Sequence, residues 1–298
     1  MQYSLAIDGG GTKTAMVIVN STHTIIKEAT YGPSSLDTVD INHLKRYLIT
    51  FLKSFEYSFS AVYIGLGGIL SSDDKIPLFN LVNEVIPKNE NCQIYVENDI
   101  DIAFLVTDNP ESSMVSIIGT GTVCYGRHLN RSHRASGWSF YEGDEGSAYY
   151  LGLQSVLDSI KAFDFRKKDT AFLKFIRRKI GIHNEHDILS IVKDFRMKRT
   201  ETAALAKFVT SYGHSDSASK EILIEGANKI VDAMEAVYKR LGFKKTTCTI
   251  IGSLGHDPIY FKCIENIINN RKLEIVLQIP KSKPHIHAAK YILKKTQN

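Results

Sequence analysis

The sequence lacks the features that mark secreted, membrane-spanning or cysteine-rich proteins. Its 298 residues include only four cysteines, which lie far apart and form no CxxC pair. This spacing argues against a disulfide framework and against a paired-thiolate zinc site. The sequence has no run of about 18 apolar residues to cross a membrane, and its start lacks the basic and apolar segments of a signal peptide. We therefore expect a cytoplasmic protein with no membrane partner.

The sequence also has little excess charge. Lys and Arg total 37 against 32 for Asp and Glu, which gives a net charge of +5. A nucleic-acid binder gathers its basic residues on one face or stripe, so no nucleic-acid partner is expected. The basic stretch at 166–179 is interpreted as a solvated helix face. Hydrophobic residues make up 43% of the chain, which suits buried cores rather than disorder, and the length suggests two domains or one large one.

Glycines follow the first predicted strand. Residues 3–7 alternate into an apolar strand, Asp8 and three glycines come next, and residues 15–19 are typical of a second strand. Two strands joined by a short glycine turn form a hairpin. A Rossmann fingerprint would need a helix after the glycines, and the spacing also lacks the ending of a P-loop. We therefore predict a hairpin turn rather than either of those nucleotide motifs.

The same pattern returns in the second half of the chain. A strand at 114–118 leads into Gly119-Thr120-Gly121-Thr122, and a strand resumes at 123–125. This repetition predicts two similarly built domains, divided at a polar stretch near residues 110–113. We expect domains at 1–112 and 113–298, and leave open whether the last helix packs back on the first domain.

Further strands are expected at 61–64, 93–96 and 247–251, with clear helices at 146–163 and 219–241. This alternation predicts the α/β class.

The two glycine and threonine turns offer backbone N–H groups with no bulky side chains in the way. Successive N–H groups form an anion-binding concavity, so two such turns facing one another across a cleft could hold the phosphates of a nucleotide. The alternative is that each is simply a hairpin turn in which glycine supplies a positive φ. The agreement between the two turns favours phosphate binding.

Two aspartates stand at the ends of predicted strands. Asp8 would lie beside the phosphates, which favours a Mg²⁺ ion between the anions; it could instead cap its own turn. Asp99 is expected to be ionised at neutral pH and could accept a proton from a substrate hydroxyl during phosphoryl transfer. Its alternative role is a helix N-cap. Lys13 could add charge to the phosphate site or be solvated.

The segment at 136–148 concentrates unusual residue types. It contains Trp138, the only tryptophan of the chain, together with acidic residues and several glycines. Carboxylates accept paired hydroxyl donors, and an aromatic face suits the C–H face of a sugar. The alternative is a capped helix start in which Asp144, Glu145 and Ser147 satisfy the first-turn N–H groups.

These motifs resemble the BadF/BadG/BcrA/BcrD-type ATPase family, within the superfamily of actin, hexokinase and the heat-shock ATPases. The likeness is to its N-acetylglucosamine kinase branch. Matching segments follow the order of the family over most of the chain: AIDGGGTKT, GPSS, ENDIDIA, IIGTGT, GWSFYEGDEGSAYYLG and, more loosely, IIGSLG. The GWxxxxGDEGSAYYLG pattern is specific, whereas DGGGT is shared by many members of the superfamily.

The resemblance implies two ribonuclease-H-like (actin-like ATPase) domains with ATP and a sugar in a central cleft. It implies an ATP-dependent sugar kinase that uses Mg²⁺ and can form a homodimer. Asp99 would be the catalytic base and a sugar contact, and Asp8 would hold the metal. The implied nucleotide contacts are Gly10, Gly11, Thr12, Lys13, Gly119, Thr120, Gly121, Gly252 and Ser253. The further sugar contacts are Thr122, Gly137, Trp138, Ser139 and Asp144.

Two departures from the family pattern bear on the sugar. Leu36 and Val123 stand where family members carry Asn, so two polar contacts are missing. The acceptor is therefore left open among N-acetylglucosamine, N-acetylmuramic acid and a hexose. Two other functions are kept: an ATPase activator of a dehydratase or reductase, which needs grouped cysteines for an iron–sulfur cluster, and a non-catalytic sugar sensor.

Overall fold

The computed structural model describes residues 2–140 and 144–296 and divides into two units. Unit 1 is Met1–Pro110 with Pro280–Asn298, and unit 2 is Glu111–Ile279. The C-terminal segment thus belongs to unit 1, which is the alternative that the expected ranges 1–112 and 113–298 left open for the last helix. The reason is that α11 (Pro284–Lys295) packs on β1 (Tyr3–Gly9), where the Ser4 hydroxyl donates to the Ala289 carbonyl at 2.8 Å.

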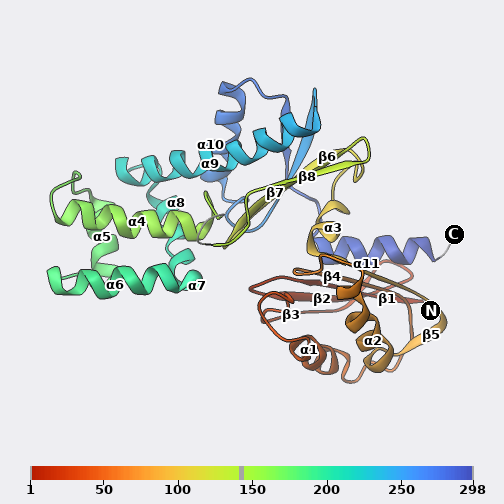
Figure 1. The fold of residues 1–298 in the computed structure, drawn as a ribbon. Helices are drawn as coiled ribbons and strands as arrows, with labels where there is room; N and C mark the ends of the chain where they lie inside the picture. The colour runs from red at the N-terminus through yellow and green to blue at the C-terminus, as the bar shows by residue number, and fades with distance from the viewer. Residues whose placement is uncertain (1, 141–143, 297–298) are drawn as a thin grey trace. The chain divides into compact units, whose positions relative to one another are not determined.

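Unit 1 is built on a five-stranded sheet in the order β3-β2-β1-β4-β5 (Figure 1). The strands after β1 are β2 (Thr14–Asn20), β3 (Ile25–Tyr31), β4 (Phe59–Leu66) and β5 (Lys88–Asn98). The first three strands are antiparallel, while β4 is parallel to both β1 and β5. The register pairs Gly9 with Thr14, so the first glycine turn closes the β1–β2 hairpin as predicted.

Helices cover both faces of this sheet, which explains why β1, β2 and β4 are buried almost throughout. One face packs against α1 (Asn42–Leu52) and α2 (Ile76–Val85), which follows the short η1 (Asp73–Lys75). The other face packs against α3 (Asp99–Phe104) and α11 (Figure 1). The carboxyl ends of β1, β4 and β5 are thereby held on a rigid support, and Asp8 and Asp99 lie at those ends.

Unit 2 repeats this topology with the strand order β10-β9-β6-β7-β8. Its strands are β6 (Ser113–Ile118), β7 (Thr122–His128), β8 (Arg131–Ala135), β9 (Thr246–Ile251) and β10 (Ile275–Gln278). Here β6, β7 and β8 are antiparallel, and β9 is parallel to β6 and β10. Read in chain order, both sheets therefore have the same connections and directions. The predicted α/β class with two similarly built domains is confirmed.

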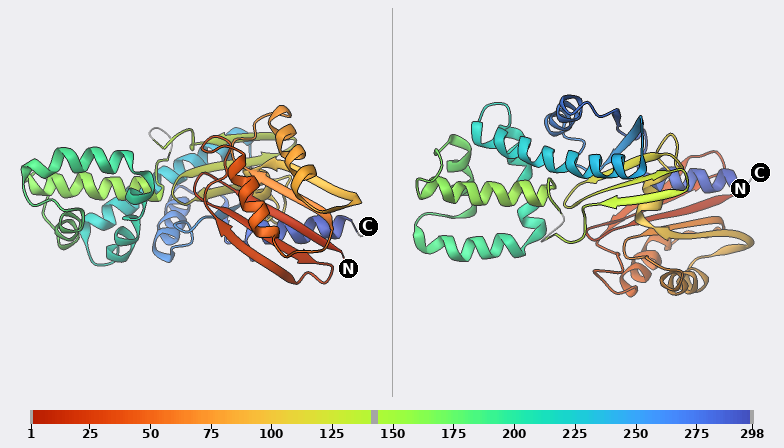
Figure 2. Two further views of the ribbon diagram at one scale, coloured as in Figure 1. Left: turned by 90° about the horizontal axis from the view of Figure 1, so that it is seen from below. Right: turned by 45° about the horizontal axis from the view of Figure 1, so that its top comes forward.

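The helices of unit 2 form two groups. Behind the sheet, α9 (Ser217–Leu241) packs on β7 and β8, and α10 (Pro258–Asn270) packs on α9. The second group extends beyond the sheet (Figure 2). It comprises α4 (Ala148–Phe163), α5 (Ala171–Ile180), α6 (Glu185–Met197), α7 (Arg199–Ala203) and α8 (Ala206–Tyr212). Within the described ranges, no helix is long and apolar enough to span a membrane.

Candidate active site

The first glycine turn is supported from behind and exposed at its tip. The Gly10 N–H donates to the Lys13 carbonyl at 2.9 Å, which leaves Gly11 and Thr12 at the exposed end of the hairpin. The N–H groups of Ser34 and Ser35 donate to the Gly10 carbonyl at 3.1 and 3.2 Å. The GPSS segment, which includes both serines, therefore fixes the turn while its outer surface stays open to a ligand.

Asp8 lies at the end of β1 and is only partly buried. Burial, followed by the negative charge of Asp99, raises the pKa of the Asp8 carboxyl from 3.8 to about 7, although Lys13 opposes this shift. In the described part of the chain, Asp8 makes no hydrogen bond that would cap its own turn. A carboxylate that faces the negative charge of a second carboxylate suits a hard cation such as Mg²⁺.

Asp99 is the first residue of α3, but it does not cap the helix. The cap is Asn98, whose side chain accepts the Ile100 N–H at 2.9 Å, while Asp101 accepts the Asn98 N–H at 3.2 Å. The capping alternative for Asp99 is therefore wrong. A Cβ at Gly67 would lie 3.3 Å from Asp99 Oδ2 and 2.8 Å from Ser35 Oγ.

The Asp99 carboxylate, the Ser35 hydroxyl and the Gly67 backbone therefore lie close together beyond the ends of β4 and β5. Sequence reasoning named only Asp99 among these three. Gly67 lies shortly after the strand expected at 61–64, but its close approach to two side chains has no local sequence signal.

The second glycine turn closes the β6–β7 hairpin. The Gly119 N–H donates to the Gly121 carbonyl at 2.9 Å, and the Gly119 carbonyl accepts the N–H of Ala148 at 2.9 Å. Gly252 has a φ of +104°, and a Cβ there would lie 2.4 Å from the Ile118 carbonyl oxygen. The structure thus brings Gly252 against this turn, with Ser253 exposed beside it.

Asp144 lies behind the second turn, and its carboxylate is bound by the protein itself. The side chain is buried; Oδ1 accepts the Thr122 N–H at 3.0 Å, and Oδ2 pairs with Arg199 Nη2 at 2.5 Å. Ser147 caps α4, and Glu145 instead pairs with Lys229 at 3.0 Å. A sugar contact by Asp144 therefore remains a prediction, and Arg199 is a residue that sequence reasoning missed.

Trp138 presents an exposed aromatic surface next to the second turn. Its side chain is 72% exposed, and the Arg134 guanidinium lies 4.4 Å from the ring centroid. The preceding Gly137 has a φ of +71°, and a Cβ there would lie 2.7 Å from the Thr122 carbonyl oxygen. Gly137, Trp138 and Thr122 are thus close together, and Ser139 follows them. Tyr141, Glu142 and Gly143 of the same segment lie outside the described residues.

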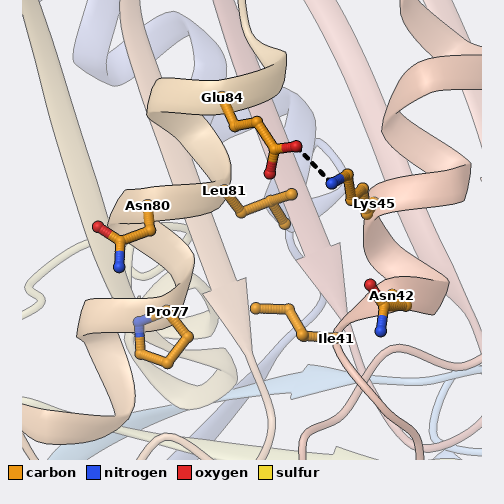
Figure 3. Close-up of a pocket in the computed structure, with 7 residues that line it drawn as sticks. All are labelled: Ile41, Asn42, Lys45, Pro77, Asn80, Leu81 and Glu84. Carbon is orange, nitrogen blue, oxygen red and sulfur yellow. Dashed lines mark hydrogen bonds and ion pairs between the residues drawn. The ribbon is translucent and has the colours of Figure 1, made fainter.

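A separate groove runs between α1 and α2 and is bridged by an ion pair between Lys45 and Glu84 at 2.5 Å (Figure 3). Ile41 and Leu81 supply apolar lining. None of the predicted site residues lines this groove. We therefore do not assign it to the candidate active site.

Comparison with known proteins identifies the family. The model of the BadF/BadG/BcrA/BcrD ATPase family matches residues 5–291. The chain belongs to this family. Its similarity extends to the N-acetylmuramic acid/N-acetylglucosamine kinase of Clostridium acetobutylicum, with 30% identity over 266 residues, covering 85% of this chain and 86% of the relative.

A further relative and a solved structure are similar to this BadF-family protein. The N-acetyl-D-glucosamine kinase of Dictyostelium discoideum is 28% identical over 263 residues, covering 81% of both chains. The structure of a candidate N-acetylglucosamine kinase from Chromobacterium violaceum has a TM-score of 0.75 at 18% identity, covering 98% of this chain and 99% of that one. The structural likeness shows the shared fold.

A substitution in the second turn tests how closely this site is packed. A Cβ at Gly121 would lie 2.3 Å from Arg199 Nη2 and 2.6 Å from Asp144 Oδ1, whereas a Cβ at Gly119 would meet nothing within 4 Å. Neither glycine has a positive φ. We expect Gly121→Ala to lower the free energy of unfolding by about 1–3 kcal/mol and Gly119→Ala to change it by less than about 0.5 kcal/mol. Thermal and denaturant unfolding measure both; equal effects would contradict the packing described here.

Proposed function

We propose that this BadF-family protein transfers the γ-phosphoryl group of ATP to a hydroxyl of an amino sugar, with N-acetylglucosamine and N-acetylmuramic acid as the first acceptors to test. The relatives named as kinases of these sugars support the proposal. The observation that carries it is the placement of Asp99. Because Asn98 and Asp101 cap α3, the Asp99 carboxylate is not needed for capping and lies near Asp8 at the ends of the strands.

In the proposed reaction, Asp99 orients the acceptor hydroxyl and takes its proton as the oxygen attacks the γ-phosphorus. The bond between that phosphorus and the β,γ-bridging oxygen breaks, and ADP leaves. The exposed backbone of Gly11 and Thr12 would donate hydrogen bonds to phosphate oxygens, as would Gly121 and the Thr120 hydroxyl in unit 2. Lys13 would add positive charge.

Asp8 is the residue proposed to hold Mg²⁺, which neutralises phosphate charge when it is bound. The fit is supported by the burial of Asp8 and by the nearby negative charge of Asp99, which together raise the pKa of the Asp8 carboxyl. No group of three or more His, Cys, Asp or Glu in the described ranges could hold a metal by itself. This agrees with Mg²⁺ chemistry, in which one or two carboxylates share the ion with substrate phosphates and water.

The placement of the cysteines argues against the alternative function, an ATPase activator of a dehydratase or reductase. Cys124 and Cys248 are buried in the core of unit 2. A hydrogen bond with Cys248, together with burial, raises the pKa of the Cys124 thiol well above its usual value. An iron–sulfur cluster needs thiolates that are grouped and accessible to the iron, and these two side chains serve the core instead.

A coupled assay of ADP release, run with N-acetylglucosamine, N-acetylmuramic acid, glucosamine and glucose, tests the proposal. We expect sugar-dependent ADP release with a kcat of about 1–100 s⁻¹ for the preferred acceptor, and mass spectrometry should show one added phosphoryl group. ADP release that is independent of every sugar would favour an ATPase. Sugar binding without ADP release would favour the sensor.

A further inference from the structure

Arg199 brings a positive charge from the helical part of unit 2 to the second glycine turn. It is the first residue of α7, far in sequence from residues 119–122. Its Nη2 atom lies 2.5 Å from Asp144 Oδ2 and only 2.3 Å from the position that a Cβ would take at Gly121. The guanidinium therefore lies against the backbone of the turn, and the absence of a side chain at Gly121 makes the space for it.

The hydrogen bonds of Arg199 use only part of its donor capacity. An arginine side chain carries five N–H donors, and its hydrogen bond in the described part of the chain is from Nη2 to Asp144. The Nε atom is buried without a hydrogen-bond partner among the described residues. Buried donors without partners are rare, and a role in binding a ligand is one explanation for such a donor.

The surroundings of Arg199 orient these remaining donors. The guanidinium carbon lies 5.6 Å from the centroid of the Phe140 ring, so an aromatic ring covers one side of the group. Asp144 holds one nitrogen of the guanidinium, and the Arg199 side chain is still one-third exposed to solvent. A guanidinium fixed in this way, with donors at its edge and access to solvent, suits an oxyanion, because its planar fork matches phosphate geometry.

We propose that Arg199 donates hydrogen bonds to a phosphate group of the nucleotide bound at the second glycine turn. This inference rests on the proposed function, because it takes the turn to be a nucleotide site. Asp144 then acts as a positioning residue, since its two oxygens hold the Thr122 N–H and the guanidinium. The competing explanation is that Arg199 only balances the buried charge of Asp144.

A set of four variants separates these explanations: Arg199→Ala, Arg199→Lys, Asp144→Asn and the double variant Arg199→Ala/Asp144→Asn. Nucleotide affinity is measured on the full chain without sugar by calorimetry with Mg-ATP, and KM is measured for ATP and for the sugar. We expect Arg199→Ala to weaken ATP binding about 10–100-fold, and Lys to restore part of it. Because the double variant lacks the guanidinium, it should bind ATP as weakly as Arg199→Ala.

Arg178→Ala is the matched control, because this exposed arginine of α5 lies outside the site; it should bind ATP like the wild type. Recovery of ATP affinity in the double variant would show that Arg199 only balances Asp144, and would overturn the inference. The inference would also be overturned if the Arg199 variants kept the wild-type affinity for ATP and raised only the KM for an acidic sugar. If Arg199→Ala does not fold, Arg199→Lys and Arg199→Gln give the same test.

These results are independent of the sugar assay. If the wild-type protein binds Mg-ATP but phosphorylates no sugar, the proposed function is wrong. The Arg199 variants would still decide whether the guanidinium contacts phosphate. If the wild-type protein binds no nucleotide, both the proposed function and the inference about Arg199 are wrong.

Discussion

Replacing Asp99 by Asn is expected to lower kcat for sugar phosphorylation about 10²–10⁴-fold, while the KM for ATP changes little. The amide keeps the size and most of the hydrogen-bonding capacity of the side chain but cannot take a proton at neutral pH. The α3 helix should stay intact, because its cap is formed by Asn98 and Asp101. Steady-state kinetics with saturating sugar measures the loss, and circular dichroism checks the fold.

Asp101→Asn is the matched control for this experiment. It makes the same chemical change two residues further along α3, where the carboxylate accepts the Asn98 N–H at 3.2 Å. Loss of this cap should lower stability by about 0.5–2 kcal/mol and leave kcat near the wild-type value. If Asp99→Asn retained wild-type turnover, or if both variants lost it equally, Asp99 would not be the catalytic base.

The parts of the fold that the sequence predicts well are the strands with buried apolar runs. β1, β4 and β6 are central strands that are buried almost throughout, and the expected strands at 3–7, 61–64 and 114–118 lie within them. The edge strands β3 and β8 were not recognised, because none of their residues is fully buried and their sequences, IIKEATY and RSHRA, lack a long apolar run. They form because the preceding strand offers unpaired N–H and C=O groups across a short turn.

The candidate site also contains some residues that the sequence reveals and others that it does not. Asp8, Asp99 and the two glycine turns stand at strand ends, which a sequence reveals because side-chain pattern and glycine content change abruptly there. Arg199 has no such signal, since it is 55 residues away from its partner Asp144 and lies in a segment whose sequence indicates only helices. Gly67 likewise meets Asp99 only through the parallel pairing of β4 with β5. Ser35 reaches the same place from a loop, through the hydrogen bond of its N–H with the Gly10 carbonyl.

Replacing Asp8 by Asn is expected to abolish most of the activity and to stabilise the protein without ligands. Removing a metal-holding carboxylate costs several kcal/mol of transition-state stabilisation, which corresponds to a loss of about 10²-fold or more in kcat/KM. The same change removes the negative charge that burial and Asp99 make unfavourable in the folded state. Kinetics at several Mg²⁺ concentrations and thermal unfolding without Mg²⁺ measure the two effects.

The direction of the stability effect depends on pH. The pKa of Asp8 rises from 3.8 in the unfolded chain to about 7 in the folded one, so the folded state binds more protons between these values and wild-type stability falls as pH rises through that window. The full shift would correspond to about 4 kcal/mol, and water at this partly exposed site reduces it to about 1–2 kcal/mol.

The stability of Asp8→Asn should therefore match that of the wild type near pH 4 and exceed it above pH 7, and added Mg-ATP should diminish the difference. Asp108→Asn, at an exposed position of unit 1, should show no such divergence. A stability gap that did not vary with pH would mean that the Asp8 carboxyl is already balanced by a cation of the protein, and would argue against its holding Mg²⁺.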